Sequence, residues 1–370
     1  MNLAIIRWRM APSGGAERFI FDIAKALDER GIEVTLIAEE CARAAAFAGR
    51  FIELAKSKGG RSQRYRRFQA SVGDILARNR FSLVQTHERL LTADIFRAGD
   101  GVHGAWFDRL KKSRPWWRRV GMNLDPMHRM YRQTELKMAR ESDMVFVANS
   151  ALVARELRQW LDVPDERIRV IENGVDLEHF SPAAPEERAA ARARLGIDAE
   201  GPVAADVGSG FERKGAFHLL RALAEPNLRD LTLIIAGRDK ARNTLIGLAD
   251  RLGVSNRVVV TGALIDVRSV LHGADLFVLP TLYDPMPNAA LEALASGLPV
   301  VTTADAGIAD AIAETGAGKV ASRDPEALAE AIAAVLGDLG AARQAALALR
   351  PRLALPQAVA KWLDLYGALS

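Results

Sequence analysis

The sequence has a single cysteine and no long hydrophobic run. Cys41 alone cannot form an internal disulfide or a cysteine-rich metal site, so nothing in the sequence calls for an oxidising compartment. No segment approaches the roughly 20 apolar residues that span a bilayer, and the first ten residues are too short and wrongly charged for a signal peptide. We therefore expect a protein of the cytoplasm.

Aromatic residues are also scarce, at 6% of the chain, whereas alanine, leucine and arginine are abundant. This balance favours helices packed on sheets over an all-β sandwich. A length of 370 residues favours two domains, because a domain typically holds about 100 to 200 residues. Apolar residues at 49% and charged residues at 26% argue against wholesale disorder and against collagen-like or solenoid repeats.

The net charge of +4 is unevenly distributed. Residues 1–176 hold 31 Lys and Arg against 23 Asp and Glu, a net +8, while residues 177–370 carry a net −4. The bases concentrate in residues 61–68 and 106–120, where tryptophans are interleaved. Tryptophan favours the headgroup level of a bilayer, and each base near an anionic leaflet contributes about 1 kcal/mol. These segments predict contact with an anionic membrane surface. The alternative is a solvated face with tryptophans packed beneath it. Binding to nucleic acid is not favoured, because no nucleic-acid module is visible.

Short apolar segments alternate with helical ones in both halves of the chain. In the first half, strands are predicted at residues 2–7, 33–38, 82–87 and 144–150, and helices at 19–31 and 151–161. In the second half, strands are predicted at 202–208, 231–237, 257–262, 275–280 and 299–303, and helices at 211–224, 243–253, 289–297 and 325–339. This alternation is typical of doubly wound, parallel α/β sheets.

A segment rich in proline and alanine, residues 181–197, separates the two halves. We predict a Rossmann-like domain at residues 1–176, a second one at 177–354, and a final helix at 355–370 that packs back on the first domain. Open α/β sheets bind ligands at the carboxyl ends of their strands. Two such domains that face one another are therefore expected to hold a substrate in a deep cleft.

In each half of the chain, a glycine-containing segment follows the first predicted strand. Gly14 and Gly15 precede a helix, where backbone N–H groups can approach an anion closely, although tight turns use glycine pairs as well. Arg213, Lys214 and Gly215 lie in VGSGFERKG. A guanidinium can hold phosphate oxygens bidentately and an ammonium adds a point charge, so this triplet suits a diphosphate. The alternative is an exposed basic pair.

Two acids with seven residues between them lie in the second half of the chain. Asp284 lies in the predicted loop TLYDPMPN and Glu292 on the helix that follows. One carboxylate can face a sugar while the other reaches a ribose diol, and backbone N–H groups near Met286, Asn288 and Ala289 can contact phosphates. Alternatively, Glu292 only stabilises the start of its helix.

A further candidate segment, RAGDGVHGAW, is predicted to be a loop that contains Asp100 and His103. A single histidine is more often structural than catalytic. The chain has no Asp-x-Asp pair and no His-x-x-x-His spacing, so we expect no dedicated metal site.

In their order along the chain, these segments resemble family 4 of the retaining glycosyltransferases, which have the GT-B fold. The likeness rests on Gly14-Gly15, on Arg213-Lys214-Gly215, and above all on the acid-x7-Glu motif within TLYDPMPNAALEALASGLPVVTT. It spans nearly the whole chain. VGSGFERKG, AGRDK and FRAGDGVHGAW are similar to the branch of lipopolysaccharide core glucosyltransferases.

The resemblance implies roles for individual residues. The second domain would hold a nucleotide sugar, with Arg213 and Lys214 on the diphosphate and Glu292 on the ribose. The transferred sugar would contact Asp284 and the loop residues Met286, Pro287 and Asn288. In the first domain, Gly15 would lie near the diphosphate, and the acceptor and sugar side would involve Gly14, Asp100 and His103. Family members commonly carry glutamate where this chain has Asp284, which leaves the donor sugar open.

The implied reaction is a metal-independent, cofactor-free transfer of a hexose from a donor, such as a UDP-sugar, to a lipopolysaccharide-core or related glycolipid. Its catalytic residues would be Arg213, Lys214, Asp284 and His103. The enzyme would act in the cytoplasm, at the inner face of the inner membrane. Front-face displacement would retain the anomeric configuration, with the leaving phosphate accepting the proton of the acceptor hydroxyl. Two alternatives remain at this point: a nucleotide-sugar epimerase or hydrolase, and a non-catalytic subunit that binds sugar nucleotides.

Overall fold

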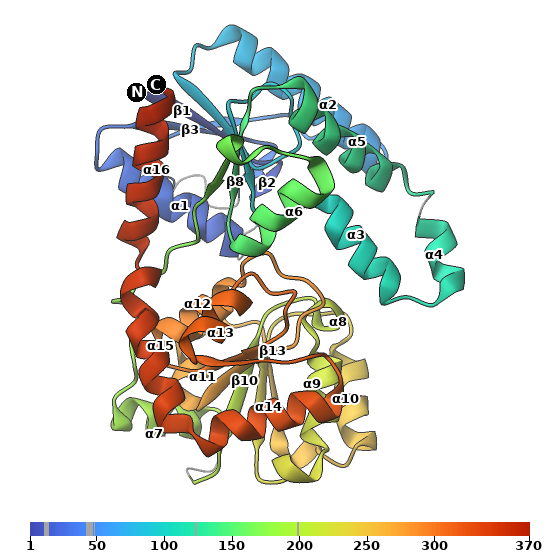
Figure 1. Cartoon of the computed structure of the whole chain (residues 1–370), viewed down its shortest axis with the longest axis vertical. Helices are drawn as coiled ribbons and strands as arrows, with labels where there is room; N and C mark the ends of the chain where they lie inside the picture. Colours follow the sequence, from blue (N-terminus) through green and yellow to red (C-terminus); the bar gives the residue numbers. More distant parts are fainter. Residues whose placement is uncertain (11–14, 42–46, 48, 123, 198–199) are drawn as a thin grey trace. The chain divides into compact units, whose positions relative to one another are not determined.

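The computed structural model describes residues 1–10, 15–41, 47, 49–122, 124–197 and 200–370. The chain divides into two compact units, the first formed by Met1–Asn173 with Pro356–Ser370 and the second by Gly174–Leu355. Each unit contains a parallel β-sheet with helices packed on it (Figure 1). The predicted α/β class with two Rossmann-like domains is therefore confirmed.

The first unit has a seven-stranded parallel sheet in the order β5-β3-β1-β6-β7-β8-β9. Its strands are β1 (Asn2–Ile6), β3 (Glu33–Ala38), β5 (Arg50–Glu53), β6 (Leu83–Thr86), β7 (Ile95–Ala98), β8 (Val145–Ala148) and β9 (Ile168–Val170). A separate parallel pair joins β2 (Arg9–Met10) to β4 (Glu40–Cys41). As expected for a parallel sheet that is covered on both faces, β8 is wholly apolar and β1 is apolar after Asn2.

The helices of this unit are α1 (Gly15–Asp28), α2 (Arg61–Arg78), α3 (His103–Lys112), α4 (Trp116–Met122), α5 (Pro126–Glu141), α6 (Ala151–Leu161) and α16 (Leu355–Leu369). Side chains define several of their starts. Asp125 caps α5 by accepting the amide hydrogen of Met127, and Ser150 caps α6 by accepting that of Val153.

The final helix, α16, contributes its residues from Pro356 onward to the first unit. Trp362 is fully buried there, and the Tyr366 hydroxyl donates to Gln85 Oε1 at 2.6 Å. Gln85 lies on β6 and its amide nitrogen is 2.9 Å from His87 Nε2. The end of the chain is thus bonded to a central strand of the first sheet.

The second unit has a six-stranded parallel sheet in the order β12-β11-β10-β13-β14-β15. Its strands are β10 (Val203–Val207), β11 (Thr232–Ala236), β12 (Val258–Gly262), β13 (Leu276–Leu279), β14 (Val300–Thr302) and β15 (Gly318–Val320). Its helices are α7 (Pro185–Arg194), α8 (Phe211–Lys214), α9 (Ala216–Leu223), α10 (Arg242–Arg251), α11 (Arg268–Gly273), α12 (Asn288–Ala295), α13 (Ala309–Thr315), α14 (Pro325–Gly337) and α15 (Leu339–Leu353). Two apolar clusters fill the two faces of this sheet.

The single helix predicted at residues 211–224 is wrong in detail. Gly215 has φ +90, a left-handed conformation, and it ends α8 and begins α9.

Among the described residues, no single helix is long and apolar enough to cross a membrane. Taken as a pair, α14 and α15 have the length and composition of a membrane span, but the chain bends by 88° between them.

Candidate active site

A one-turn helix, α8, positions Arg213 and Lys214 just beyond the carboxyl end of β10. The chain then passes β13 so closely that a Cβ atom at Gly215 would lie 2.0 Å from the carbonyl oxygen of Pro280. Only glycine combines this approach with the observed positive φ. The two basic side chains are therefore held beside the end of β13.

Both bases converge on Asp284. Lys214 Nζ lies 3.3 Å and Arg213 Nη1 lies 3.6 Å from Asp284 Oδ2. Arg213 Nη1 also donates to the carbonyl oxygen of Tyr283 at 2.8 Å. The Asp284 and Lys214 side chains are each only 12% exposed, so their charges are poorly screened by solvent and compensate one another. The structure thus brings together three residues that the sequence predicted for different parts of a ligand.

Backbone hydrogen bonds fix the loop that carries Asp284. Its amide donates to Asp305 O at 3.1 Å, and the amide of Gly307 donates to Asp284 O at 2.8 Å. The loop is joined to α8 as well, because the amide of Leu282 donates to Arg213 O at 2.7 Å. These hydrogen bonds fix the position of the Asp284 backbone.

Arg323, which precedes α14, adds a further connection to α8. Its Nε donates to Pro280 O at 3.0 Å and its Nη2 to Glu212 O at 3.1 Å. Arg323 was not predicted from the sequence, because an isolated arginine between two elements carries no local signal of its tertiary partners.

The remaining predicted residues of the second unit follow Asp284 on the same segment. Met286 and Pro287 are buried, and α12 begins at Asn288. Glu292 is the fifth residue of α12 and is half-buried. All predicted donor residues of this unit therefore follow β10 or β13, two strands that are neighbours in the sheet.

In the first unit, Asp100 follows β7 and pairs with Arg7, whose Nη1 is 3.3 Å from Asp100 Oδ2. Burial raises the pKa of Asp100, but the guanidinium groups of Arg7 and Arg89 lower it further, for a net decrease. Asp100 is thus ionised at neutral pH. Gly15 is the first residue of α1, and Gly14 lies outside the described residues.

The prediction of His103 in a loop is wrong: it is the first residue of α3. Its backbone amide donates to both Glu135 carboxylate oxygens at 3.1 Å, and Glu135 pairs with Arg89 at 3.0 Å. This buried acid caps the helix from α5, a tertiary contact that the local sequence does not reveal.

The His103 ring is enclosed. It is 8% exposed, and its Nε2 lies 2.9 Å from Nδ1 of His128 on α5. Burial, together with the charge of Arg89, lowers the pKa of His103 to about 3. The imidazole is therefore neutral at pH 7, and it can exchange a hydrogen bond but not supply a positive charge.

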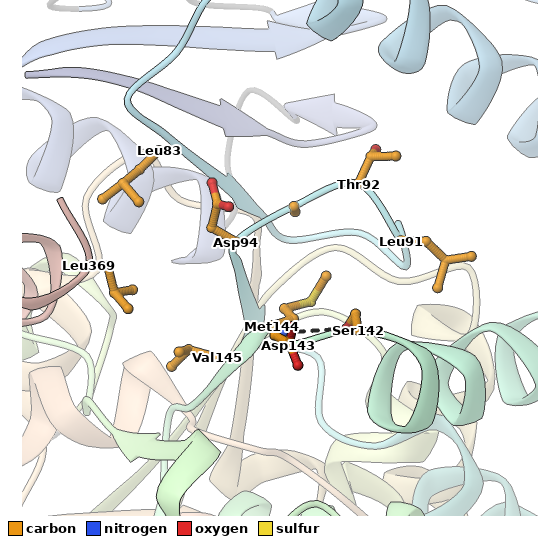
Figure 2. A pocket seen from close by; sticks show the side chains of 10 residues that line it. Leu83, Leu91, Thr92, Asp94, Ser142, Asp143, Met144, Val145 and Leu369 are labelled. Carbon is orange, nitrogen blue, oxygen red and sulfur yellow. Dashed lines mark hydrogen bonds between the residues drawn. The ribbon is translucent and has the colours of Figure 1, made fainter.

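A pocket of about 430 Å³ lies elsewhere in the first unit (Figure 2). It is lined by residues at the amino ends of β6, β7 and β8, among them Leu83, Asp94 and Val145, and by Leu369 of α16. The predicted site residues follow carboxyl ends of strands, so none of them lines this pocket. Among the described residues, no group of three or more His, Cys, Asp or Glu side chains is placed to hold a metal ion.

Two solved structures share this architecture over nearly the entire chain. WaaG, described as a glycosyltransferase involved in lipopolysaccharide biosynthesis, is 24% identical with a TM-score of 0.83, and the match covers 98% of this chain and 99% of WaaG. HepE of Anabaena, solved with UDP and glucose, is 18% identical with a TM-score of 0.78, covering 99% of this chain and 98% of HepE. The fold is therefore that of the GT-B glycosyltransferases.

Family comparisons extend this conclusion to the sequence. Residues 13–179 match the model for Glycosyltransferase Family 4, and residues 187–347 match the model for Glycosyl transferases group 1. The chain belongs to this family of glycosyltransferases, as its motifs predicted.

Curated relatives include D-inositol 3-phosphate glycosyltransferases from two bacteria. The protein of Mycobacterium sp. (strain KMS) is 36% identical over 185 residues, which is 48% of this chain and 41% of the relative. The protein of Salinispora tropica is 33% identical over 257 residues, which is 63% of this chain and 52% of the relative. The chain thus spans about half the length of these relatives.

Proposed function

We propose that this protein is a hexosyltransferase that moves a hexose from a UDP-sugar to a glycolipid acceptor of the lipopolysaccharide-core type. The observation that carries the proposal is the convergence of Arg213 and Lys214 on Asp284 at the ends of β10 and β13. Two fixed cations beside a single carboxylate leave a net positive charge, which suits a diphosphate. Family membership supports the reaction class, and the ligands of HepE support the choice of UDP.

The donor would occupy the second unit. Arg213 and Lys214 bind the diphosphate, and Glu292 on α12 accepts hydrogen bonds from the ribose hydroxyls. Hydroxyl groups of the hexose contact Asp284 and the segment formed by Met286, Pro287 and Asn288. Because the aspartate side chain is shorter than that of glutamate, the carboxylate of Asp284 reaches less far from the backbone.

The reaction proceeds by front-face displacement with retention of configuration. The bond between the anomeric carbon and the leaving phosphate oxygen breaks while the acceptor oxygen bonds to the same carbon. The leaving phosphate oxygen takes the proton of the acceptor hydroxyl. Arg213 and Lys214 stabilise the charge that grows on the diphosphate, so the step needs no metal ion and no cofactor. In the first unit, Asp100 and neutral His103 form the acceptor side.

One assay tests this proposal. The purified chain is incubated in EDTA with UDP- and GDP-sugars, with and without a deacylated lipopolysaccharide core or D-inositol 3-phosphate, and free nucleotide is measured. We expect UDP release that requires an acceptor and survives EDTA, with an unchanged anomeric configuration by NMR. Release without an acceptor would indicate a hydrolase, inversion would exclude the proposed step, and no release with any pair would contradict the donor and acceptor classes.

We further propose that α3 and α4 bring the protein to the anionic inner face of the inner membrane. Trp116 and Trp117 begin α4 and are 72% and 62% exposed, which contradicts the alternative that these tryptophans are packed beneath a solvated face. Except for Arg114, which lies between α3 and α4, the basic residues of the 61–68 and 106–120 segments lie on α2, α3 and α4. Exposed indole rings beside bases suit a headgroup layer.

Neutralising Lys112 and Arg119 should weaken binding to phosphatidylserine vesicles about 30-fold, since each base contributes about 1 kcal/mol. The double variant Trp116→Ala/Trp117→Ala should weaken it as well. Vesicle sedimentation measures both, with Trp160→Ala on α6 as the matched control because Trp160 is 40% exposed. Unchanged sedimentation of both double variants would remove the membrane from the proposal.

A further inference from the structure

Asp206 is a buried acid that the proposed reaction does not use. It is the fourth residue of β10, in the apolar run VAADV, and it is 1% exposed. Residues two apart on a strand share a face, so Asp206 lies on the same face as Ala204, which packs in the cluster with Phe211 of α8. Its Oδ1 atom has no hydrogen-bond partner. A buried carboxyl oxygen without a hydrogen-bond partner is rare in proteins and needs a physical explanation.

Few charges surround this carboxyl. On the neighbouring strands, Ile235 is its partner in register and Val278 packs in the same apolar cluster. Three charged or titratable side chains of nearby elements have other bonding partners: Arg213 donates to Tyr283 O, Asp239 accepts from the amides of Phe211 and Ala241, and the His218 ring is bonded to Arg323 O. The positive charge of Lys214 on α8 acts to lower the pKa of Asp206.

The Lys214 side chain lies directly over the end of β10. A Cβ atom at Gly208 would be 2.6 Å from Lys214 Cδ and 2.8 Å from its Nζ. Lys214 Nζ is also 3.3 Å from Asp284 Oδ2. The Lys214 side chain therefore lies at the end of the strand that carries Asp206, and its ammonium pairs with the Asp284 carboxylate.

Burial raises the pKa of Asp206 to about 7, and the positive charge of Lys214 offsets only part of this effect. The carboxyl therefore gains or loses its proton near neutral pH. A second anion near Lys214 would therefore change the average charge of the Asp206 carboxyl group.

We propose that Asp206 is a positioning residue for Lys214, and that its carboxyl takes up a proton from solvent when a diphosphate binds the Lys214 ammonium. The inference rests on the proposed function. In the empty site, Lys214 balances Asp284 and part of the charge on Asp206. A diphosphate adds negative charge to the same ammonium, so the ionised carboxyl becomes less favourable and the protonated one predominates. Protonation frees the lysine for its ligand.

The first experiment needs no donor. The folded protein holds a proton on Asp206 up to about pH 7, whereas an unfolded Asp loses it near about pH 4, so stability should fall as pH rises through this range. Asp206→Asn removes this loss, and its melting temperature should exceed that of the wild type increasingly between these two pH values. Lys214→Met should extend the fall to higher pH. Asp230→Asn, at an 80% exposed acid, is the matched control.

The second experiment measures UDP-glucose affinity by calorimetry between about pH 6 and about pH 8.5. Wild-type affinity should weaken by up to about tenfold for each pH unit above 7, and buffers with different ionisation enthalpies should show proton uptake. Asp206→Asn should flatten the profile and bind more tightly than the wild type at the highest pH.

The outcomes separate the two proposals. Absence of UDP-glucose binding at every pH contradicts the proposed donor, while the stability experiment still decides the coupling of Asp206 to Lys214. A stability profile unchanged in both Asp206→Asn and Lys214→Met overturns the inference, and so does binding without proton uptake. If Asp206→Asn does not fold, the inference is tested by the proton uptake of the wild type in calorimetry and by the stability profile of Lys214→Met.

Discussion

Replacing Lys214 with alanine is expected to lower acceptor-dependent turnover by about 10² to 10³, because it removes a preorganised charge from the leaving diphosphate. Lys214 lies over Gly208 and 3.3 Å from Asp284, so no mobile side chain has to be ordered before the reaction. The charge on the diphosphate grows as the sugar bond breaks. The loss should therefore appear mainly in kcat, with a smaller rise in the KM for the donor.

Lys319→Ala is the matched control for this substitution. Lys319 lies on β15 of the same unit and is exposed, so its loss changes the net charge equally without touching the site. Turnover should be unchanged in that variant. A Lys214→Ala protein that unfolds at the wild-type temperature and retains wild-type turnover would exclude Lys214 from the reaction.

Much of the fold could be predicted because its signals are local. The strand at residues 33–38 and the helices at 151–161 and 355–369 occur where apolar spacing placed them. The helix α2 was not predicted, since it buries only Tyr65, Phe68 and Val72 among its 18 residues and its arginines suggested an exposed patch. A helix that packs by so narrow a face has almost no periodic signal.

The site shows the same division between local and tertiary information. Motif spacing selected Arg213, Lys214 and Asp284, but it assigned the bases and the acid to different parts of a ligand. Their mutual contacts depend on Gly215 passing Pro280, which no local pattern encodes. Asp206 did leave a signal, since an acid inside the apolar run VAADV is unusual in a buried strand. A carboxylate in such a run should be examined for a charged partner.

Replacing Asp275 with alanine is expected to lower the free energy of unfolding of the second unit by about 3 to 5 kcal/mol. Its buried carboxylate accepts hydrogen bonds from Arg188 and Arg192 of α7 and from Arg343 of α15, at 2.6 to 2.8 Å. It also accepts the amide hydrogen of Val203, at the start of β10, at 2.9 Å. Removing it takes away the carboxylate that these three guanidinium groups share where two helices meet the sheet.

Hydrogen exchange of the β10 and β13 amides measures this effect within the second unit, and Asp230→Ala provides the contrast. Asp230 pairs with Arg229 at 3.4 Å, but both side chains are at least 80% exposed, so its loss should cost at most about 1 kcal/mol. Tryptophan fluorescence reports on the first unit separately, since all six tryptophans lie there. Equal protection in Asp275→Ala and Asp230→Ala would mean that the arginines find other partners. A selective loss in Asp275→Ala would show that this acid holds the strand on which Asp206 is carried.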